Sequence, residues 1–147
     1  TLLIIEKEMV YMIKGIAHVA YTASDMEKSL HFYCDQLGFE KAFEIRDDEG
    51  KPWINYIKVG KNQFIELFYG GKKKDHSQNE AGFSHLCLEV DDIQKVVEEL
   101  KKKNVIIDVE PKQGKDFNWQ CWIRDPDGNR IELMQISEKS PQYKASR

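Results

Sequence analysis

The sequence has few of the features that indicate a disulfide-stapled, membrane-spanning or nucleic-acid-binding protein. Its 147 residues include only three cysteines, Cys34, Cys87 and Cys121, which are far apart and form no CxxC pair. We therefore expect free, inert thiols and a reducing, cytoplasmic setting. No apolar run approaches the roughly 20 residues of a membrane span, and the short apolar start is soon interrupted by charges at residues 6–8. A formal net charge of only −3 provides no basic surface for nucleic acid or an anionic membrane.

What the chain does contain suits one compact domain or two small fused modules. Hydrophobic residues make up 41% and charged residues 32% of the sequence, so a sizeable core is possible. We predict five segments: an N-terminal appendage (1–13), a first module (14–70), a polar linker (71–82), a second module (83–137) and a C-terminal tail (138–147).

The first module begins with a β-rich stretch that contains His18 and continues into a helix. Ser24, with Glu27 three residues later, forms a capping-box pattern that predicts where this helix begins. Turn-forming stretches then separate three predicted strands at 41–46, 53–59 and 63–69. The apolar face expected on the helix consists of Met26, Leu30, Tyr33 and Leu37.

The second module repeats this order of elements. A strand containing His85 precedes a helix for which Asp91 and Gln94 resemble a capping box. Three more strands are predicted at 105–110, 120–124 and 130–136, and the sequence DPDGN joins the last two as a hairpin turn. The apolar face expected on this helix consists of Ile93, Val96, Val97 and Leu100.

Corresponding residues recur at a nearly constant offset. His18 and His85 are 67 residues apart, as are Asp25 and Asp92, and Glu66 and Glu132 are 66 apart. The chain therefore has an α+β pattern of two tandem βαβββ modules. Each module has a histidine near the start of its first strand and a glutamate in the middle of its last.

These four residues form a candidate metal shell. If the modules pair about a pseudo-twofold axis, His18, Glu66, His85 and Glu132 can converge on one point. Two imidazoles and two carboxylates suit Zn, Ni, Co, Mn or Fe. Each residue alone has a simpler explanation, because a strand histidine is more often a satisfied core or rim residue. The glutamates could likewise pair with Arg124 or Arg130, or face water. Recurrence of both residue types favours the metal shell.

Several stretches resemble the vicinal oxygen chelate superfamily, which includes glyoxalase I, extradiol dioxygenases, methylmalonyl-CoA epimerase and antibiotic-resistance proteins. The resemblance covers about residues 14–137 and is most specific in DPDGNRIEL. It implies an eight-stranded, cup-shaped mixed sheet formed by paired modules, with helices outside and a divalent metal at its centre. It also implies the ligands His18, Glu66, His85 and Glu132, and a small-molecule substrate bound by a homodimer.

Resemblance to glyoxalase I implies a reaction as well. A substrate with two neighbouring oxygens would bind the metal, Glu132 would act as the base next to the carbonyl, and Glu66 would be its catalytic counterpart on the other side of the substrate. Glutathione is a less secure cosubstrate, because Thr22 and Gly70 stand where bacterial glyoxalase I has the Arg and Asn that grip it. The expected substrate-pocket residues are Thr22, Phe64, Phe68, Trp122 and Met134.

Two other activities remain open. An extradiol-type dioxygenase would use His18, His85 and Glu132 as a facial triad, but such enzymes usually lack a carboxylate at the position of Glu66. A metal-free protein that sequesters a drug or another small ligand would instead use aromatic side chains, for which core packing is the simpler explanation. The aromatic candidates for such a pocket are Trp53, Phe64, Phe68, Trp119 and Trp122.

Overall fold

A computed structural model describes residues 13–76 and 80–147, so most of the predicted N-terminal appendage lies outside the described residues. The elements of the first module are β1 (His18–Thr22), α2 (Met26–Leu30), the π-helical turn η1 (His31–Gln36), β2 (Glu40–Arg46), β3 (Pro52–Gly60) and β4 (Gln63–Phe68). Those of the second module and the C-terminal segment are β5 (Leu86–Glu89), α3 (Ile93–Lys102), β6 (Val109–Gln113), β7 (Trp119–Arg124), β8 (Arg130–Gln135) and α4 (Pro141–Ala145).

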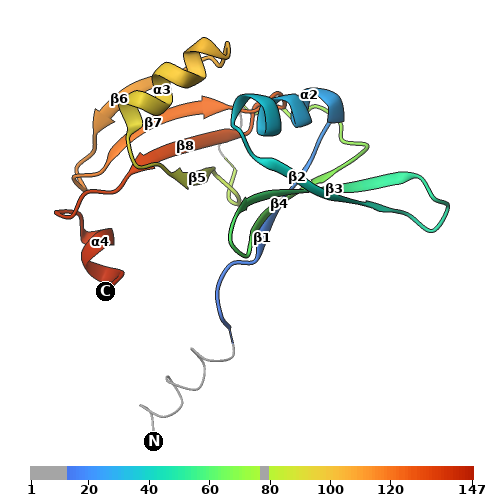
Figure 1. Cartoon of the computed structure of the whole chain (residues 1–147), viewed down its shortest axis with the longest axis horizontal. Coiled ribbons are helices and arrows are strands. Elements are labelled where there is room, and N and C mark those ends of the chain that lie inside the picture. Colours follow the sequence, from blue (N-terminus) through green and yellow to red (C-terminus); the bar gives the residue numbers. More distant parts are fainter. Residues whose placement is uncertain (1–12, 77–79) are drawn as a thin grey trace, which may run out of the picture.

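Each module forms its own four-stranded mixed sheet (Figure 1). The strand orders are β1-β4-β3-β2 and β5-β8-β7-β6, and in each sheet the first strand runs parallel to the last. The predicted α+β fold with tandem βαβββ modules is confirmed. The eight strands lie in two sheets that are not closed into one, and the shared topology places each histidine strand directly beside its glutamate strand.

The helix caps differ by one residue from the predicted capping boxes. The N-cap of α2 is Asp25, whose carboxylate accepts a hydrogen bond from the backbone N–H of Lys28. The N-cap of α3 is Asp92, which accepts from Lys95 in the same way. The prediction of Ser24 and Asp91 as caps was therefore wrong. An aspartate carboxylate in extended backbone caps both helices, and the Ser24 hydroxyl bonds elsewhere.

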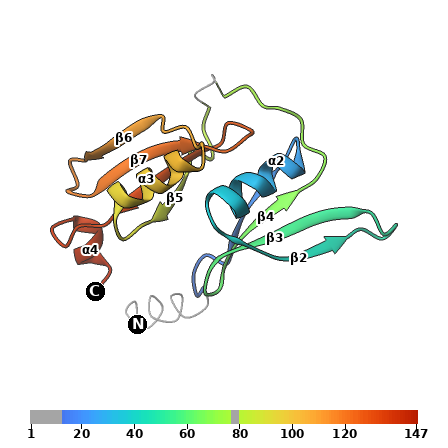
Figure 2. The ribbon, with the colours of Figure 1, turned by 45° about the horizontal axis from the view of Figure 1, so that its top comes forward.

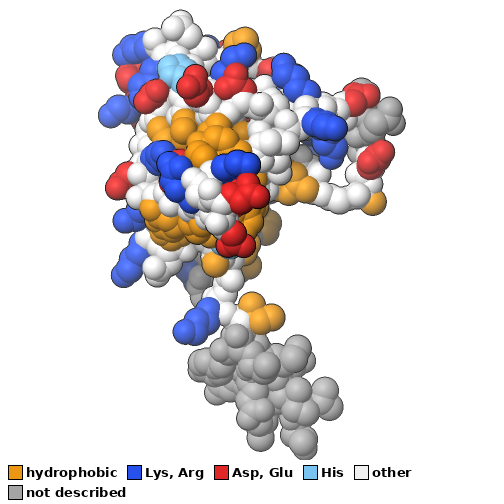
Figure 3. Space-filling model, turned by 90° about the vertical axis from the view of Figure 1, so that its right-hand side faces the viewer, with side chains coloured by type: hydrophobic (Ala, Val, Ile, Leu, Met, Phe, Trp, Pro, Cys, Tyr) orange, Lys and Arg blue, Asp and Glu red, His pale blue; other side chains and the backbone are white. Residues whose placement is uncertain are grey.

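Figure 2 shows the two modules, each with its own strands and helix. One hydrophobic cluster contains residues of both modules. It includes strand residues that flank the two glutamates, namely Ile65 and Leu67 around Glu66 and their counterparts around Glu132. Because strand side chains alternate, the face of each sheet that carries the glutamate is opposite the face that joins this core. On the side of the molecule shown in Figure 3, hydrophobic side chains gather across the middle and charged side chains lie over and around them.

Polar contacts also join the modules at a seam formed by η1, the start of α2 and the DPDGN turn. The Tyr33 hydroxyl donates to the Asp125 carboxylate at 2.9 Å, and both residues are buried. The Ser24 hydroxyl and backbone N–H both donate to the carboxylate of Asp127. Burial, followed by the charge of Asp125, raises the pKa of Tyr33 well above its ordinary value. The phenol therefore stays protonated and remains a donor.

Two segments of the second module depart from the sequence-based expectation. Val105 is buried and donates its N–H to Leu100 at the end of α3, so the chain enters β6 only at Val109. The residues after β8 include the short helix α4, which the sequence analysis did not predict. Over the part of the chain that the structure describes, no helix has the length and apolar character needed to cross a membrane.

Candidate functional site

The first half of the candidate site is a histidine–glutamate pair on adjacent parallel strands. His18 on β1 and Glu66 on β4 place Nε2 and Oε2 3.2 Å apart. In the strand register His18 lies beside Phe64, two residues before Glu66, so both side chains point to the same face. We call His18 and Glu66 the first pair.

The second pair repeats this geometry in the other module. Nε2 of His85, which directly precedes β5, lies 3.1 Å from Oε2 of Glu132 on β8. Glu132 is only 6% exposed and Glu66 only 7%. A carboxylate removed from water to this degree requires a cation or a hydrogen-bond donor, and a histidine nitrogen provides one in both pairs. The alternative pairing of these glutamates with Arg124 or Arg130 is absent from the ion pairs among residues 13–76 and 80–147.

The two pairs do not meet within one chain. Among the described residues, no group of three or more His, Cys, Asp and Glu side chains is close enough to hold one metal ion. The core and the seam occupy the space between the modules, which keeps the pairs apart. A single copy of the chain thus presents two separate histidine–glutamate pairs, and the convergence of all four residues stays a prediction.

Side chains on the neighbouring strands distinguish the pairs. Tyr56 on β3 lies directly across from Glu66, and hydrogen bonding with this carboxylate is the main cause that raises the pKa of the Tyr56 phenol. Glu132 lies beside Cys87 on β5 and Trp122 on β7. Burial, followed by the charge of Glu132, raises the pKa of Cys87 to about 12, so this thiol is not a nucleophile at neutral pH.

A stack of charged and aromatic groups surrounds the second pair. The His85 ring lies 4.7 Å from the Trp122 ring in an edge-to-face arrangement. On the same indole, the guanidinium carbon of Arg130 lies 4.3 Å from the ring centroid. Near the first pair, the ring of Tyr56 stacks on Phe43 at 4.3 Å and contacts Phe64 at its edge.

The five predicted pocket residues lie on these same strands. Thr22 is beside Phe68 in the register of β1 and β4, and Phe68 packs edge-to-face on Trp53. Phe64 and Trp122 flank the first and second pairs, respectively. Met134 accepts a hydrogen bond from the Asn118 amide through its sulfur and lines a cavity of about 440 Å³ with Cys87 and Glu89. Their contact with a substrate stays a prediction.

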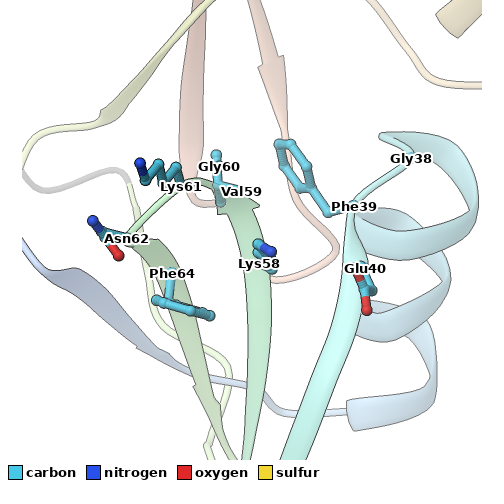
Figure 4. A pocket seen from close by; sticks show the side chains of 9 residues that line it. All are labelled: Gly38, Phe39, Glu40, Lys58, Val59, Gly60, Lys61, Asn62 and Phe64. Atoms are coloured by element: carbon cyan, nitrogen blue, oxygen red, sulfur yellow. The ribbon is translucent and has the colours of Figure 1, made fainter.

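A second cavity, of about 450 Å³, lies at the turn between β3 and β4 (Figure 4). Phe39, Lys58, Lys61 and Phe64 are among its lining residues. Phe64 connects this cavity to the first pair because it is the register neighbour of His18. Neither cavity is lined by a residue of either pair.

The donors present fit a divalent transition metal. Each pair offers one imidazole nitrogen and one nearly buried carboxylate whose facing atoms are about 3 Å apart, and two such pairs make the nitrogen and oxygen set that Zn, Ni, Co, Mn and Fe accept. The sequence analysis identified these four residues but missed Tyr56. The position of Tyr56 could have identified it, because Tyr56 in the first module and Trp122 in the second are the aromatic residues directly across from the two glutamates.

Comparisons with known proteins identify the family of this chain. Residues 15–133 match the model of the Glyoxalase/Bleomycin resistance protein/Dioxygenase superfamily. The chain is 33% identical over 129 residues to a probable lactoylglutathione lyase of Synechocystis sp., covering 84% of this chain and 97% of that protein. It is also 35% identical over 126 residues to the uncharacterized protein YaeR of Escherichia coli, covering 82% and 95% of the two chains.

A solved structure supports the same assignment. The crystal structure of a glyoxalase family protein from Enterococcus faecalis superposes with a TM-score of 0.72 at 26% identity, covering 84% of this chain and 99% of that one. Together with the repeated modules and the family match over most of its length, this shows that the chain belongs to the glyoxalase/bleomycin resistance/dioxygenase, or vicinal oxygen chelate, superfamily.

Proposed function

We propose that this protein is a metal-dependent, glyoxalase I-like lyase that moves a proton next to a carbonyl group. Its substrate binds through two neighbouring oxygens, as in the hemithioacetal of a 2-oxoaldehyde or a similar hydroxy-ketone. The observation that carries the proposal is the repeated pair of a histidine and a nearly buried glutamate on adjacent strands. The relative named probable lactoylglutathione lyase supports the same chemistry.

The complete centre is proposed to form in a homodimer. The first pair of one copy and the second pair of the other would together supply two imidazoles and two carboxylates. This assembly is supported by the separation of the pairs within one chain and by the exposed histidine side chains, 44% for His18 and 32% for His85. Twofold symmetry then gives two equal centres per dimer.

His18, Glu66, His85 and Glu132 would hold the divalent ion, and the two neighbouring oxygens of the substrate would bind to the same ion. When bound, a divalent ion supplies Lewis-acid stabilisation of the negative charge that develops on those oxygens. Glu132 removes the proton from the carbon next to the carbonyl and delivers it to the adjacent carbon. Transfer of this proton between adjacent carbons would isomerise the substrate without loss of atoms.

Glu132, rather than Glu66, is proposed as the main base because of their neighbours. The Tyr56 phenol hydrogen-bonds with Glu66 and helps to hold this carboxylate in place. The corresponding interaction of Glu132 is with the Cys87 thiol, which is a weaker donor. Glu132 is therefore freer to leave its partner and take a proton.

The identity of the thiol that forms the hemithioacetal can be tested. Gly70, two residues after the end of β4, has a φ of +84°, a conformation that favours glycine, and it brings no side chain toward a substrate. Thr22 has no charge with which to hold a carboxylate. Glutathione is thus one cosubstrate among several to test. The three free cysteines support a reducing, cytoplasmic setting for such thiol chemistry.

The alternative functions within the superfamily do not need Glu66 as a metal ligand. A dioxygenase needs only His18, His85 and Glu132 as ligands, and a sequestering protein needs no metal. Burial of Glu66 against His18, in the geometry that Glu132 has against His85, supports four ligands rather than three.

Metal analysis combined with turnover tests the proposed function. We expect one divalent transition ion per chain after reconstitution, and conversion of the methylglyoxal–glutathione or another methylglyoxal–thiol hemithioacetal that is lost on chelation and restored by Ni or Zn. Metal at this stoichiometry without turnover of any adduct would contradict the lyase and favour a dioxygenase. Ligand binding without metal would favour a sequestering protein.

Mixing two inactive variants tests the dimer. His18→Ala damages the first pair and His85→Ala the second, so each homodimer lacks a complete centre. Random reassociation makes half of the dimers mixed, each with one intact centre, and restores about a quarter of the wild-type activity. No recovery on mixing, with exchange of subunits verified by mass, would show that the four ligands do not come from two chains.

A further inference from the structure

Arg130 is a cation on the strand that carries Glu132 of the second pair. It precedes Glu132 by two residues on β8, so both side chains belong to the same face of the sheet. Its guanidinium carbon lies 4.3 Å from the centroid of the Trp122 ring, and the same ring contacts His85 at 4.7 Å. The indole therefore links the cation to the candidate metal ligands.

The donors of Arg130 are available for a ligand. Arg124, its register neighbour on β7, is held by Asp108 through two hydrogen bonds of 2.7 and 3.0 Å. Arg46 is held by Glu44. Within residues 13–76 and 80–147, the ion pairs and hydrogen bonds that involve arginines do not include Arg130, whose side chain instead packs on Trp122.

Stacking on an indole prepares a guanidinium to bind an anion. The aromatic face restrains the flat group while its N–H donors at the edge stay exposed, which is the arrangement that grips a carboxylate with two parallel hydrogen bonds. Nothing comparable exists at the corresponding position of the first module. That position, also two residues before the glutamate, is Phe64. The second pair thus has a cation where the first has an apolar ring.

We propose that Arg130 binds a carboxylate of the substrate, so that this protein prefers vicinal-oxygen substrates with a carboxylate close to the reacting carbons. The inference rests on the proposed function for its substrate frame and adds the charge of that substrate. It also gives the protein a carboxylate-binding group that the Thr22 and Gly70 positions do not provide.

Three hemithioacetals of similar size test this preference in the metal-loaded protein. Methylglyoxal combined with mercaptoacetate, 2-mercaptoethanol or cysteamine gives an anionic, a neutral or a cationic adduct. We expect the wild type to prefer the anionic adduct over the neutral one by at least about tenfold in kcat/KM, because hydrogen bonds to charged groups are the strong ones. Arg130→Gln should lose this preference mainly through KM, and Arg130→Lys should keep part of it.

Arg124→Gln is the matched control. It removes the same charge from the neighbouring strand, but from a side chain already occupied by Asp108, and should leave the preference unchanged. A wild type that does not distinguish the adducts, or an Arg130→Gln variant that keeps the wild-type ratio, would overturn the proposal. Thermal unfolding of each variant verifies that it is folded.

Binding of inert analogues separates this inference from the proposed function. Calorimetric titration of (methylthio)acetate and 2-(methylthio)ethanol needs no turnover. We expect the wild type to bind the acetate more tightly than Arg130→Gln does, by about tenfold, with no difference for the alcohol. That result without turnover of any adduct would refute the lyase and keep the carboxylate site. Equal or unmeasurable binding of the acetate by both proteins would overturn the site even where turnover is found.

Discussion

The first and second pairs have the same ligands but different surroundings. His18 and Glu66 lie among aromatic rings, with the Tyr56 phenol bonded to the glutamate. His85 and Glu132 lie beside an indole that carries the guanidinium of Arg130. The repeated module thus keeps the histidine and glutamate that are proposed as metal ligands and varies the residues around them. In an assembly that joins the two pairs, a substrate would meet an apolar side and a cationic side.

The largest expected effect comes from replacing one glutamate at a time. Glu132→Gln should lower kcat about 10²–10⁴-fold, the range for loss of a general base, while metal is retained. The decrease in kcat of Glu66→Gln should be at least tenfold smaller than that of Glu132→Gln, because the proposed role of Glu66 is mainly to hold the metal. Single-turnover rates with metal content measured on the same samples test this. Equal losses would mean that both carboxylates move protons and would break the distinction between the pairs.

Replacing the histidines tests whether the pairs share one centre. If the pairs share one centre, His18→Ala and His85→Ala should weaken metal binding by similar factors, on the order of 100-fold. Loss of a ligand should cost at least as much affinity as loss of a residue that only hydrogen-bonds to a ligand. Competition with a chromogenic chelator measures both affinities. Half the wild-type stoichiometry with unchanged affinity would instead show that each pair binds its own ion.

The phenol of Tyr56 has a smaller expected effect. Tyr56→Phe keeps the ring stacked on Phe43 but removes the hydrogen bond to Glu66. We expect a fewfold change in kcat and metal affinity, consistent with a net contribution of about 0.5–1.5 kcal/mol for one hydrogen bond. At the second pair, the corresponding substitution of the aromatic residue across from the glutamate is Trp122→Phe. If Tyr56→Phe matched Glu132→Gln in effect, the phenol would be part of the proton transfer.

The smallest effect on turnover should come from the seam between the modules, which lies on the other side of the sheets from the pairs. Tyr33→Phe removes a buried hydrogen bond to Asp125 and should lower the free energy of unfolding by about 1–3 kcal/mol. Since the pKa of Tyr33 is raised in the folded state, the unfolded chain loses this proton first as pH rises above about 10. Wild-type stability should therefore fall there.

Denaturant titrations at pH 8 and at pH 10–11 measure this linkage. In Tyr33→Phe the free energy of unfolding should decrease less steeply with pH than in the wild type. The difference in slope should be at most that of one proton, about 1.36 kcal/mol per pH unit. Tyr21, whose pKa is also raised by burial and by Asp125, keeps a similar contribution in both proteins. An unchanged slope would show that Tyr33 does not control alkaline unfolding.

The sequence by itself determined the repeat, the order of elements in both modules and the two histidine–glutamate pairs. Hydrophobic periodicity and turn residues are local properties, so they survive without knowledge of the fold. The sequence did not show correctly which of two adjacent polar residues caps each helix. The caps proved to be Asp25 and Asp92, and Ser24 instead bonds to Asp127, a residue 103 positions away.

Only the tertiary structure decided how the modules face each other and which neighbours each glutamate has. Packing of both modules into one core separates the pairs within a chain, which no spacing along the sequence reveals. Strand register brings Tyr56 opposite Glu66 and places Trp122 between His85 and Arg130. These contacts run between strands, and their physical basis is cross-strand packing rather than local propensity.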